Sequence, residues 1–162
     1  IVDIDKMVYV AKNFGGVEHR NELVRELDGV KYYNDSIGTT PSRTMNGTLS
    51  LFDKKIILIA GGYDKNIPFD SFGPKVVEKV KTLVLMGATS DKIEKSVKSA
   101  PNYKEGSPKI IRVNSLEKAI KTCREEAEKG DVVSLSPACA SFDMFPDFET
   151  RGEEFKKLVN EL

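Results

Sequence analysis

The chain has 162 residues, a length that suits one domain with a substantial core. Its 25 basic and 25 acidic residues give a formal net charge of zero, which argues against nucleic acid or an anionic membrane as a partner. Two cysteines, Cys123 and Cys139, are too few for a disulfide scaffold and predict free, buried thiols in a reducing compartment. With no apolar run of membrane-spanning length and no signal-peptide pattern, we expect a cytoplasmic monomer.

The first third of the chain predicts a helix and then a β-hairpin. Apolar residues recur at helical spacing over residues 4–14, and the pattern ends at Gly15-Gly16. Two extended runs, 23–27 and 30–33, are separated by Asp28-Gly29, which favours a two-residue hairpin turn. Because the chain opens in mid-pattern and without Met, we expect it to be a piece of a longer protein.

After the hairpin, strands alternate with helices. Short apolar runs predict buried strands at 55–60, 83–86, 110–113 and 132–135. Helical spacing predicts the elements between them, with faces carrying Met45, Leu49 and Phe52; Phe69, Phe72, Val76 and Val80; Ile93, Val97 and Ala100; and Phe155, Leu158, Val159 and Leu162. Thr40-Pro41 marks a helix start, and Asn114 with Glu117 resembles a capping box. This alternation indicates an α/β fold with a doubly wound, mostly parallel sheet.

Polar loops follow the predicted strands. In such sheets ligands bind beyond the carboxyl ends of the strands, where residues 34–40, 61–65 and 136–141 and Gly87 would meet. The loops supply hydroxyls, glycines and one cation, Lys65, which suit a small anion. Taken singly, each has a structural interpretation, since such glycines form turns, Ser and Thr cap helices, and a lone His19 is ordinarily a partly buried residue. The sequence shows no P-loop, metal cluster or catalytic triad.

The same loops resemble a known family. The resemblance rests on five motifs: His19-Arg20, Tyr33-Asn34-Asp35-Ser36 with Thr39, Gly61-Gly62 with Lys65, Leu135–Ser141 through Phe148, and Arg151-Gly152. Together, and in this order, they resemble the C-terminal domain of the Mur ligases, most of all in the members that add D-glutamate to UDP-N-acetylmuramoyl-L-alanine.

The resemblance implies an ATP-dependent ligase of peptidoglycan synthesis. Members of this family activate a carboxylate as an acyl phosphate, which the amine of the incoming amino acid attacks, and their last domain is Rossmann-like. The resemblance places Mg²⁺ and most ATP contacts in a central domain that precedes this one. We therefore expect residues 1–18 to be a helix and linker from that domain, residues 19–162 to form the acceptor-binding domain, and the chain by itself to hold no catalytic residue or metal site and to be inactive.

Eight positions carry the implied site. The residues that would bind the carboxylates of D-glutamate are Thr39, Lys65, Ser141 and the Phe148 backbone amide. The residues that would lie near the nucleotide are His19, Arg20, Asp35 and Ser36. The physical logic agrees for the first group, because a dianionic amino acid needs a cation and several donors at fixed separation.

Two departures and two alternatives accompany this interpretation. Many members of the family have Lys where this chain has Ile37, which removes one expected contact near the nucleotide phosphates, and Tyr63-Asp64 departs from the commonest form.

A folylpolyglutamate synthase-like ligase domain would share much of the pattern. The third hypothesis is a stand-alone module that binds a nucleotide or another anion.

Overall fold

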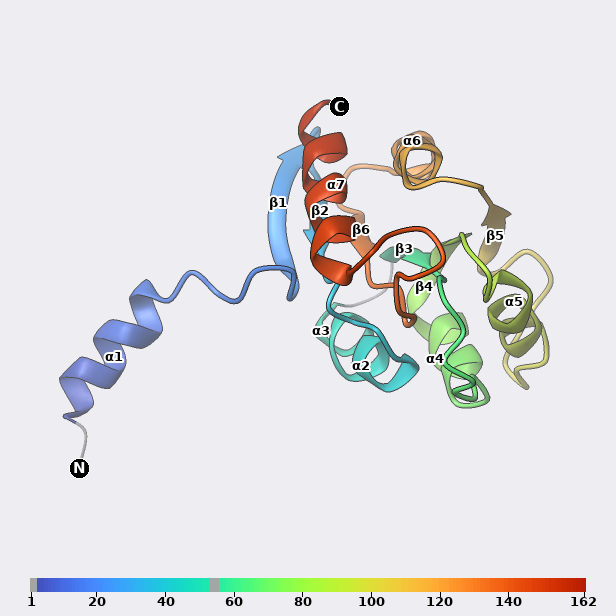
Figure 1. Ribbon diagram of the computed structural model, residues 1–162, viewed down its shortest axis with the longest axis horizontal. Coiled ribbons are helices and arrows are strands. Elements are labelled where there is room, and N and C mark those ends of the chain that lie inside the picture. Colours follow the sequence, from blue (N-terminus) through green and yellow to red (C-terminus); the bar gives the residue numbers. More distant parts are fainter. Residues whose placement is uncertain (1–2, 53–55) are drawn as a thin grey trace.

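The computed structural model describes residues 3–52 and 56–162, and this part of the chain contains a six-stranded sheet (Figure 1). The strand order is β1-β2-β6-β3-β4-β5, and all neighbouring strands are parallel except β1 and β2. The strands are β1 (Glu22–Leu27), β2 (Val30–Asn34), β3 (Ile56–Ala60), β4 (Val80–Leu85), β5 (Lys109–Arg112) and β6 (Val132–Leu135). The predicted α/β class, with a mostly parallel sheet preceded by a hairpin, is confirmed.

The hairpin turn lies where the sequence predicts it. Asp28 has φ 53° and Gly29 has φ 79°, so both central residues adopt the left-handed conformation. Such a turn matches the twist of the two strands that it joins, and Asp-Gly tolerates it with little strain. The register Leu27↔Val30 follows directly from this two-residue connection.

Strand β3 supplies side chains to both faces of the sheet. Its five residues are fully buried, as a central parallel strand requires. Ile57 and Ile59 join a core with α6 (Leu116–Glu126) and α7 (Phe148–Asn160). The alternate residues join a second core with helices α3 (Thr48–Leu51), α4 (Phe72–Lys79) and α5 (Ser90–Lys98). Helices therefore cover both faces, which confirms the doubly wound arrangement.

Some helix boundaries differ from the predictions. The helix that starts at Thr40 ends early, because α2 (Pro41–Asn46) and α3 are separated at Gly47, whose ψ of −104° is not helical. Val80 is not on a helical face, since it is the first residue of β4. The cap of α6 is Ser115, which accepts a hydrogen bond from the Lys118 backbone N–H, and not Asn114. Leu162 lies beyond α7 and is 38% exposed. The predicted start of the third strand at residue 55 lies outside the described residues.

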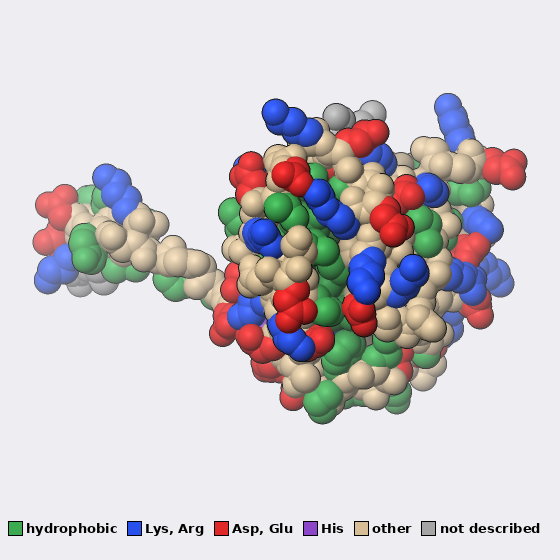
Figure 2. All heavy atoms as spheres, turned by 90° about the horizontal axis from the view of Figure 1, so that it is seen from above, with side chains coloured by type: hydrophobic (Ala, Val, Ile, Leu, Met, Phe, Trp, Pro, Cys, Tyr) green, Lys and Arg blue, Asp and Glu red, His purple; other side chains and the backbone are tan. Residues whose placement is uncertain are grey.

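Helix α1 (Ile4–Asn13) lies apart from the sheet and its covering helices (Figure 1). None of its described residues is buried, and Ile4, Tyr9 and Val10 expose more than half of their surface. Figure 2 shows this helix beside the body of the molecule, whose visible face carries interspersed basic and acidic side chains. Among residues 3–52 and 56–162, no helix combines the length and apolar character needed to cross a bilayer.

Candidate functional site

The loops after β2, β3 and β6 meet at the carboxyl edge of the sheet. Ser136 Oγ donates a hydrogen bond of 2.6 Å to Asp35 Oδ2, which joins the loops after β6 and β2. The backbone N–H of Gly61 donates to Pro137 O (2.8 Å), and that of Tyr63 donates to Ala140 O (2.9 Å), which joins the loops after β3 and β6. Their predicted convergence is confirmed.

Lys65 and Thr39 come together at this edge. Lys65 Nζ lies 3.3 Å from Thr39 Oγ1 and forms no salt bridge with any described residue. The neighbouring Asp64 pairs instead with Lys92. Thr39 and Lys65 line a cleft of only about 10 Å³, which is the space of a single water molecule. A cation that has no acidic partner among the described residues thus lies beside a hydroxyl at a small cleft.

Ser141 and Phe148 lie farther along the loop after β6 and make other contacts. The Ser141 carbonyl accepts hydrogen bonds from the backbone N–H groups of Met144 (2.9 Å) and Phe145 (2.8 Å). Phe148 is the first residue of α7, and its backbone N–H donates to no described residue, as expected in a first helical turn. No hydrogen bond links Ser141 or Phe148 to the Lys65–Thr39 pair among the described residues, so the structure brings only two of the four positions into direct contact.

Asp35 is buried within a set of hydrogen-bond donors. Its side chain is 4% exposed, and its oxygens accept from the Asn21 backbone N–H (3.2 Å) and the hydroxyls of Thr48 (3.1 Å) and Ser136 (2.6 Å). Burial raises the pKa of this carboxyl, and the three donors oppose the rise only in part. Asp35 therefore connects three segments, and its negative charge is costly where it stands.

The raised pKa of Asp35 predicts a pH-dependent contribution to stability. The contribution is fully present below the ordinary value of 3.8 and is lost as the pH rises through the higher pKa of the folded state. An Asp35→Asn variant lacks this titration. The difference in Tm, wild type minus variant, should therefore shrink as the pH rises above 3.8. A constant difference across thermal melts in that range would contradict the prediction.

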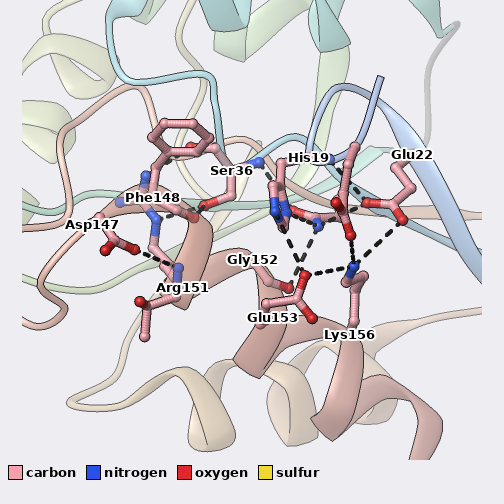
Figure 3. A network of polar contacts seen from close by, with 12 residues as sticks. His19, Glu22, Ser36, Asp147, Phe148, Arg151, Gly152, Glu153 and Lys156 are labelled. Carbon is pink, nitrogen blue, oxygen red and sulfur yellow. Dashed lines mark hydrogen bonds and ion pairs between the residues drawn. The ribbon is translucent and has the colours of Figure 1, made fainter. Parts of the chain in front are cut away.

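His19 and Ser36 take part in an internal network between β2, α7 and the turn before β1 (Figure 3). Asn34 Nδ2 donates to His19 Nδ1 (2.9 Å), and the His19 ring packs edge-on against Phe148, with centroids 6.0 Å apart. A Cβ atom on Gly152 would lie 2.3 Å from His19 Nδ1, so only glycine permits this close approach. Ser36 Oγ donates to Phe148 O (2.7 Å). The side chains of His19 and Ser36 therefore form structural contacts, which connect the turn before β1 and the loop after β2 to β2 and α7.

Arg151 is a residue that sequence reasoning did not place in the site. It is 1% exposed, and its guanidinium donates to Ser36 Oγ (3.0 Å), Ser36 O (2.9 Å) and Cys139 O (3.2 Å). No described carboxylate forms a salt bridge with it, and burial lowers its pKa to about 10. Arg151 lies four residues before Phe155 and eight before Val159, so its place on the buried stripe of α7 was visible in the sequence.

One group of side chains has the spacing of a metal site among the described residues. Glu18, His19 and Glu153 bring their ligand atoms within 4.8 Å of one another. The ammonium group of Lys156 already bonds Glu153 (2.7 Å) and Glu18 (2.5 Å), as Figure 3 shows for Glu153. This cluster is therefore an ion-pair network that attaches the turn before β1 to α7.

Comparison with known proteins agrees with this architecture. Residues 19–139 match the family described as Mur ligase, glutamate ligase domain. Over 99% of this chain, a UDP-N-acetylmuramoylalanine--D-glutamate ligase of Clostridium botulinum (strain Okra) is 56% identical, and one of Clostridium acetobutylicum is 52% identical. The crystal structure of a murein peptide ligase, Mpl, from Psychrobacter arcticus 273-4 has the same fold, with a TM-score of 0.60 and 15% identity over 95% of this chain and 32% of its own.

The chain spans about a third of the curated relatives that it matches, 35% of the length of each of the two ligases. The match to the family covers most of the chain and includes the loops after β2 and β3 and part of the loop after β6. The alignments with the two ligases extend over 99% of the chain. The chain therefore belongs to the Mur ligase family and carries its glutamate ligase domain.

Proposed function

We propose that this chain is the acceptor-binding part of a ligase that adds D-glutamate to UDP-N-acetylmuramoyl-L-alanine in peptidoglycan synthesis. The names of the relatives, 52% and 56% identical over 99% of the chain, support this substrate over a folate. The chain's share of their length, 35%, leaves room for the parts that would bind the other substrates. The proposed enzyme works in the cytoplasm as a monomer.

The observation that carries the proposal is the Lys65–Thr39 pair. Lys65 has no described anionic partner, stands 3.3 Å from a hydroxyl, and lies at the carboxyl edge where ligands of such sheets bind. An amino acid with two carboxylates needs this combination of a cation and neutral donors. Ser141 and the Phe148 amide, in this proposal, receive the second carboxylate across the same edge.

The proposed reaction needs ATP and Mg²⁺, and residues of this chain fit the nucleotide. Arg20 and Asp35 line one cavity of about 380 Å³, a size within the usual range of small-molecule sites. ATP supplies the phosphoryl group that activates the carboxylate. The part assigned to this chain is to hold D-glutamate with its amine toward that carboxylate and to exclude water that would hydrolyse the activated group. Mg²⁺ belongs, in this proposal, to the remainder of the enzyme.

Residues 1–18, in the same proposal, connect this domain to the ATP-binding part of the enzyme. Helix α1 exposes Ile4, Tyr9 and Val10 and buries none of its described residues. Apolar side chains of this kind gain stability when another surface covers them. Residues 19–162 form the acceptor-binding domain, which approaches the nucleotide when the enzyme closes.

An NMR titration of the isotope-labelled chain with D-glutamate, with L-glutamate as control, tests whether the acceptor site is preformed. We expect selective amide shifts at Thr39, Lys65, Ser141 and Phe148 with the D isomer. Equal shifts with both isomers, or shifts confined to other positions, would contradict the proposed site. The small volume of the cleft predicts weak binding until the remaining parts of the enzyme close over it.

Lys65→Ala should raise the KM for D-glutamate by about tenfold or more in the ligase that contains this chain, because a charge-assisted hydrogen bond is lost. The KM for ATP should stay unchanged. Lys121→Ala is the matched control, since Lys121 is exposed on α6 and pairs with Glu117. Unchanged D-glutamate kinetics in the Lys65 variant would overturn the assignment of this residue.

A further inference from the structure

One face of helix α5 holds the loop after β3 at three points. Thr89, the residue before the helix, Lys92 and Ser96 lie three and then four residues apart, a spacing that places them on the same face. Their partners, in the same order, are the loop residues Gly62, Asp64 and Phe69. The loop that carries Lys65 is thus attached to α5 both before and after that residue.

The hydroxyl of Thr89 is buried and fully used. Thr89 is 1% exposed, and its Oγ1 accepts from the Gly62 backbone N–H (3.0 Å) and donates to Gly62 O (3.0 Å). Burial raises the pKa of the Cys139 thiol to about 11, so at neutral pH the thiol keeps its proton and donates to the same Oγ1 (3.0 Å). One side chain therefore joins the loops after β3, β4 and β6.

Thr89 gives up a common role to make these contacts. A threonine directly before a helix ordinarily accepts a hydrogen bond from a backbone N–H of the first turn. Thr89 is the N-cap of α5, yet its side chain makes no such bond, and its own backbone N–H donates to Gly62 O (3.1 Å). Its hydrogen bonds therefore serve the loop that carries Lys65 and not the helix that follows.

The contacts of Thr89 matter for Lys65 because both residues line the same small cleft, together with Cys139 and Thr39. Among the described residues, Lys65 Nζ forms a side-chain hydrogen bond only with Thr39 Oγ1 (3.3 Å). A lysine side chain has many rotamers, so one such bond restrains it weakly. Its position therefore depends on the backbone of the loop, which Thr89 fixes three residues earlier, at Gly62.

Lys92 balances the charge next to Lys65. Asp64, the preceding residue, is ionised at neutral pH, because hydrogen bonds from Lys92 and from the Asn66 backbone N–H (2.8 Å) lower the pKa of its carboxyl. An unbalanced carboxylate here would repel an anionic ligand and compete with it for Lys65. Asp64 pairs with Lys92 and not with Lys65, so the ammonium group of Lys65 stays available.

We propose that Thr89 and Lys92 are positioning residues of the acceptor site, Thr89 by fixing the backbone before Lys65 and Lys92 by neutralising Asp64. The inference rests on the proposed function, because it assumes that Lys65 binds a carboxylate of D-glutamate. Both residues act through Lys65. Loss of either should weaken the binding of D-glutamate and spare ATP, because neither residue lines the cavity proposed for the nucleotide.

An NMR comparison of isotope-labelled chains tests the role of Thr89 without any substrate. Thr89→Val keeps the shape of the side chain and removes the hydroxyl, so amide signals at residues 62–65 should shift and the Gly62 amide should exchange faster. Thr89→Ser should restore both. Thr122→Val is the matched control, because Thr122 is buried on α6, at the other face of the sheet. Unchanged signals at residues 62–65 in Thr89→Val would overturn this role.

Kinetics of the ligase that contains this chain test both roles. Thr89→Val should raise the KM for D-glutamate by about tenfold, and Thr89→Ser should recover most of the loss. Lys92→Ala should raise it by about threefold, more at low salt, because the pair with Asp64 is exposed. Adding Asp64→Asn to Lys92→Ala should return the wild-type value, since the charge to be balanced is gone. Lys98→Ala is the matched control, because Lys98 is similarly exposed on α5 and pairs with Glu94.

The KM for ATP should stay unchanged in all of these variants. A rise in the KM for D-glutamate that persists in the Lys92→Ala/Asp64→Asn double variant, or that Lys98→Ala reproduces, would contradict the role of Lys92. If Lys65→Ala raises this KM while Thr89→Val and Lys92→Ala leave it unchanged, the acceptor assignment stands and the present inference falls. A wild-type ligase that does not use D-glutamate would instead overturn the proposed function, and the NMR comparison would still decide whether Thr89 fixes the loop.

Discussion

Arg151→Met is expected to lower the free energy of unfolding by about 3 kcal/mol. The guanidinium donates to the carbonyl groups of Ser36 and Cys139 and to the Ser36 hydroxyl, all of them buried. Methionine removes these donors and leaves two carbonyl oxygens without them. It also removes a desolvation cost, visible in the lowered pKa of Arg151, so the net effect is smaller than four lost hydrogen bonds would suggest.

Urea denaturation of Arg151→Met and of Arg124→Met compares the loss of a buried arginine with the loss of an arginine at the surface. Arg124 is partly exposed and pairs with Asp28, so its replacement should cost about 0.5 kcal/mol or less. A drop in stability common to both variants would show that loss of charge, and not loss of the buried contacts, is responsible. Because Arg151 connects the loops after β2 and β6, its variant should also disturb amide shifts at Ser36 and Ser141.

Gly61→Ala is expected to destabilise the protein by about 3 kcal/mol or more. Gly61 has φ 113°, a conformation that residues with a Cβ atom rarely adopt, and the added Cβ would lie 1.9 Å from Met86 O. Both obstacles belong to the backbone, so no side chain can move to relieve them. The loop after β3, which carries Lys65, would have to shift away from β4.

Urea denaturation of Gly61→Ala and of Gly130→Ala separates the cost of the positive φ from the cost of the steric overlap with Met86. Gly130 has φ 94°, but a Cβ atom there would meet nothing within 4 Å. Its replacement should therefore cost only the conformational strain, about 1–2 kcal/mol. Equal losses in the two variants would mean that the close approach to Met86 contributes nothing.

The elements that the sequence predicted well are those whose signals are local. The turn at Asp28-Gly29 depends on two residues that accept positive φ. Strand β6 was predicted at its observed bounds, since a run of apolar residues after Gly130 has no helical alternative of adequate length. Gly47 shows the limit of such reasoning, because the apolar spacing of Met45 and Leu49 continues through the break that it introduces.

The candidate site was predictable to a similar extent. The rule that ligands bind at the carboxyl ends of parallel strands placed Thr39 and Lys65 at one edge, and the structure brings them into contact. No such rule predicts which side chains form hydrogen bonds with one another. His19 and Ser36, expected near the nucleotide, form hydrogen bonds with Asn34 and with α7.

By itself, the sequence determined the fold class, the order of the elements and the edge of the sheet at which the polar loops meet, because periodicity, turn residues and chain order are properties of neighbouring positions. The tertiary structure alone decided which charges remain free. Lys65, Arg20 and Arg43 lack described acidic partners, whereas Lys92 and Lys156 have them. The physical reason is that an ion pair depends on the distance between segments far apart in the chain, which only their packing sets.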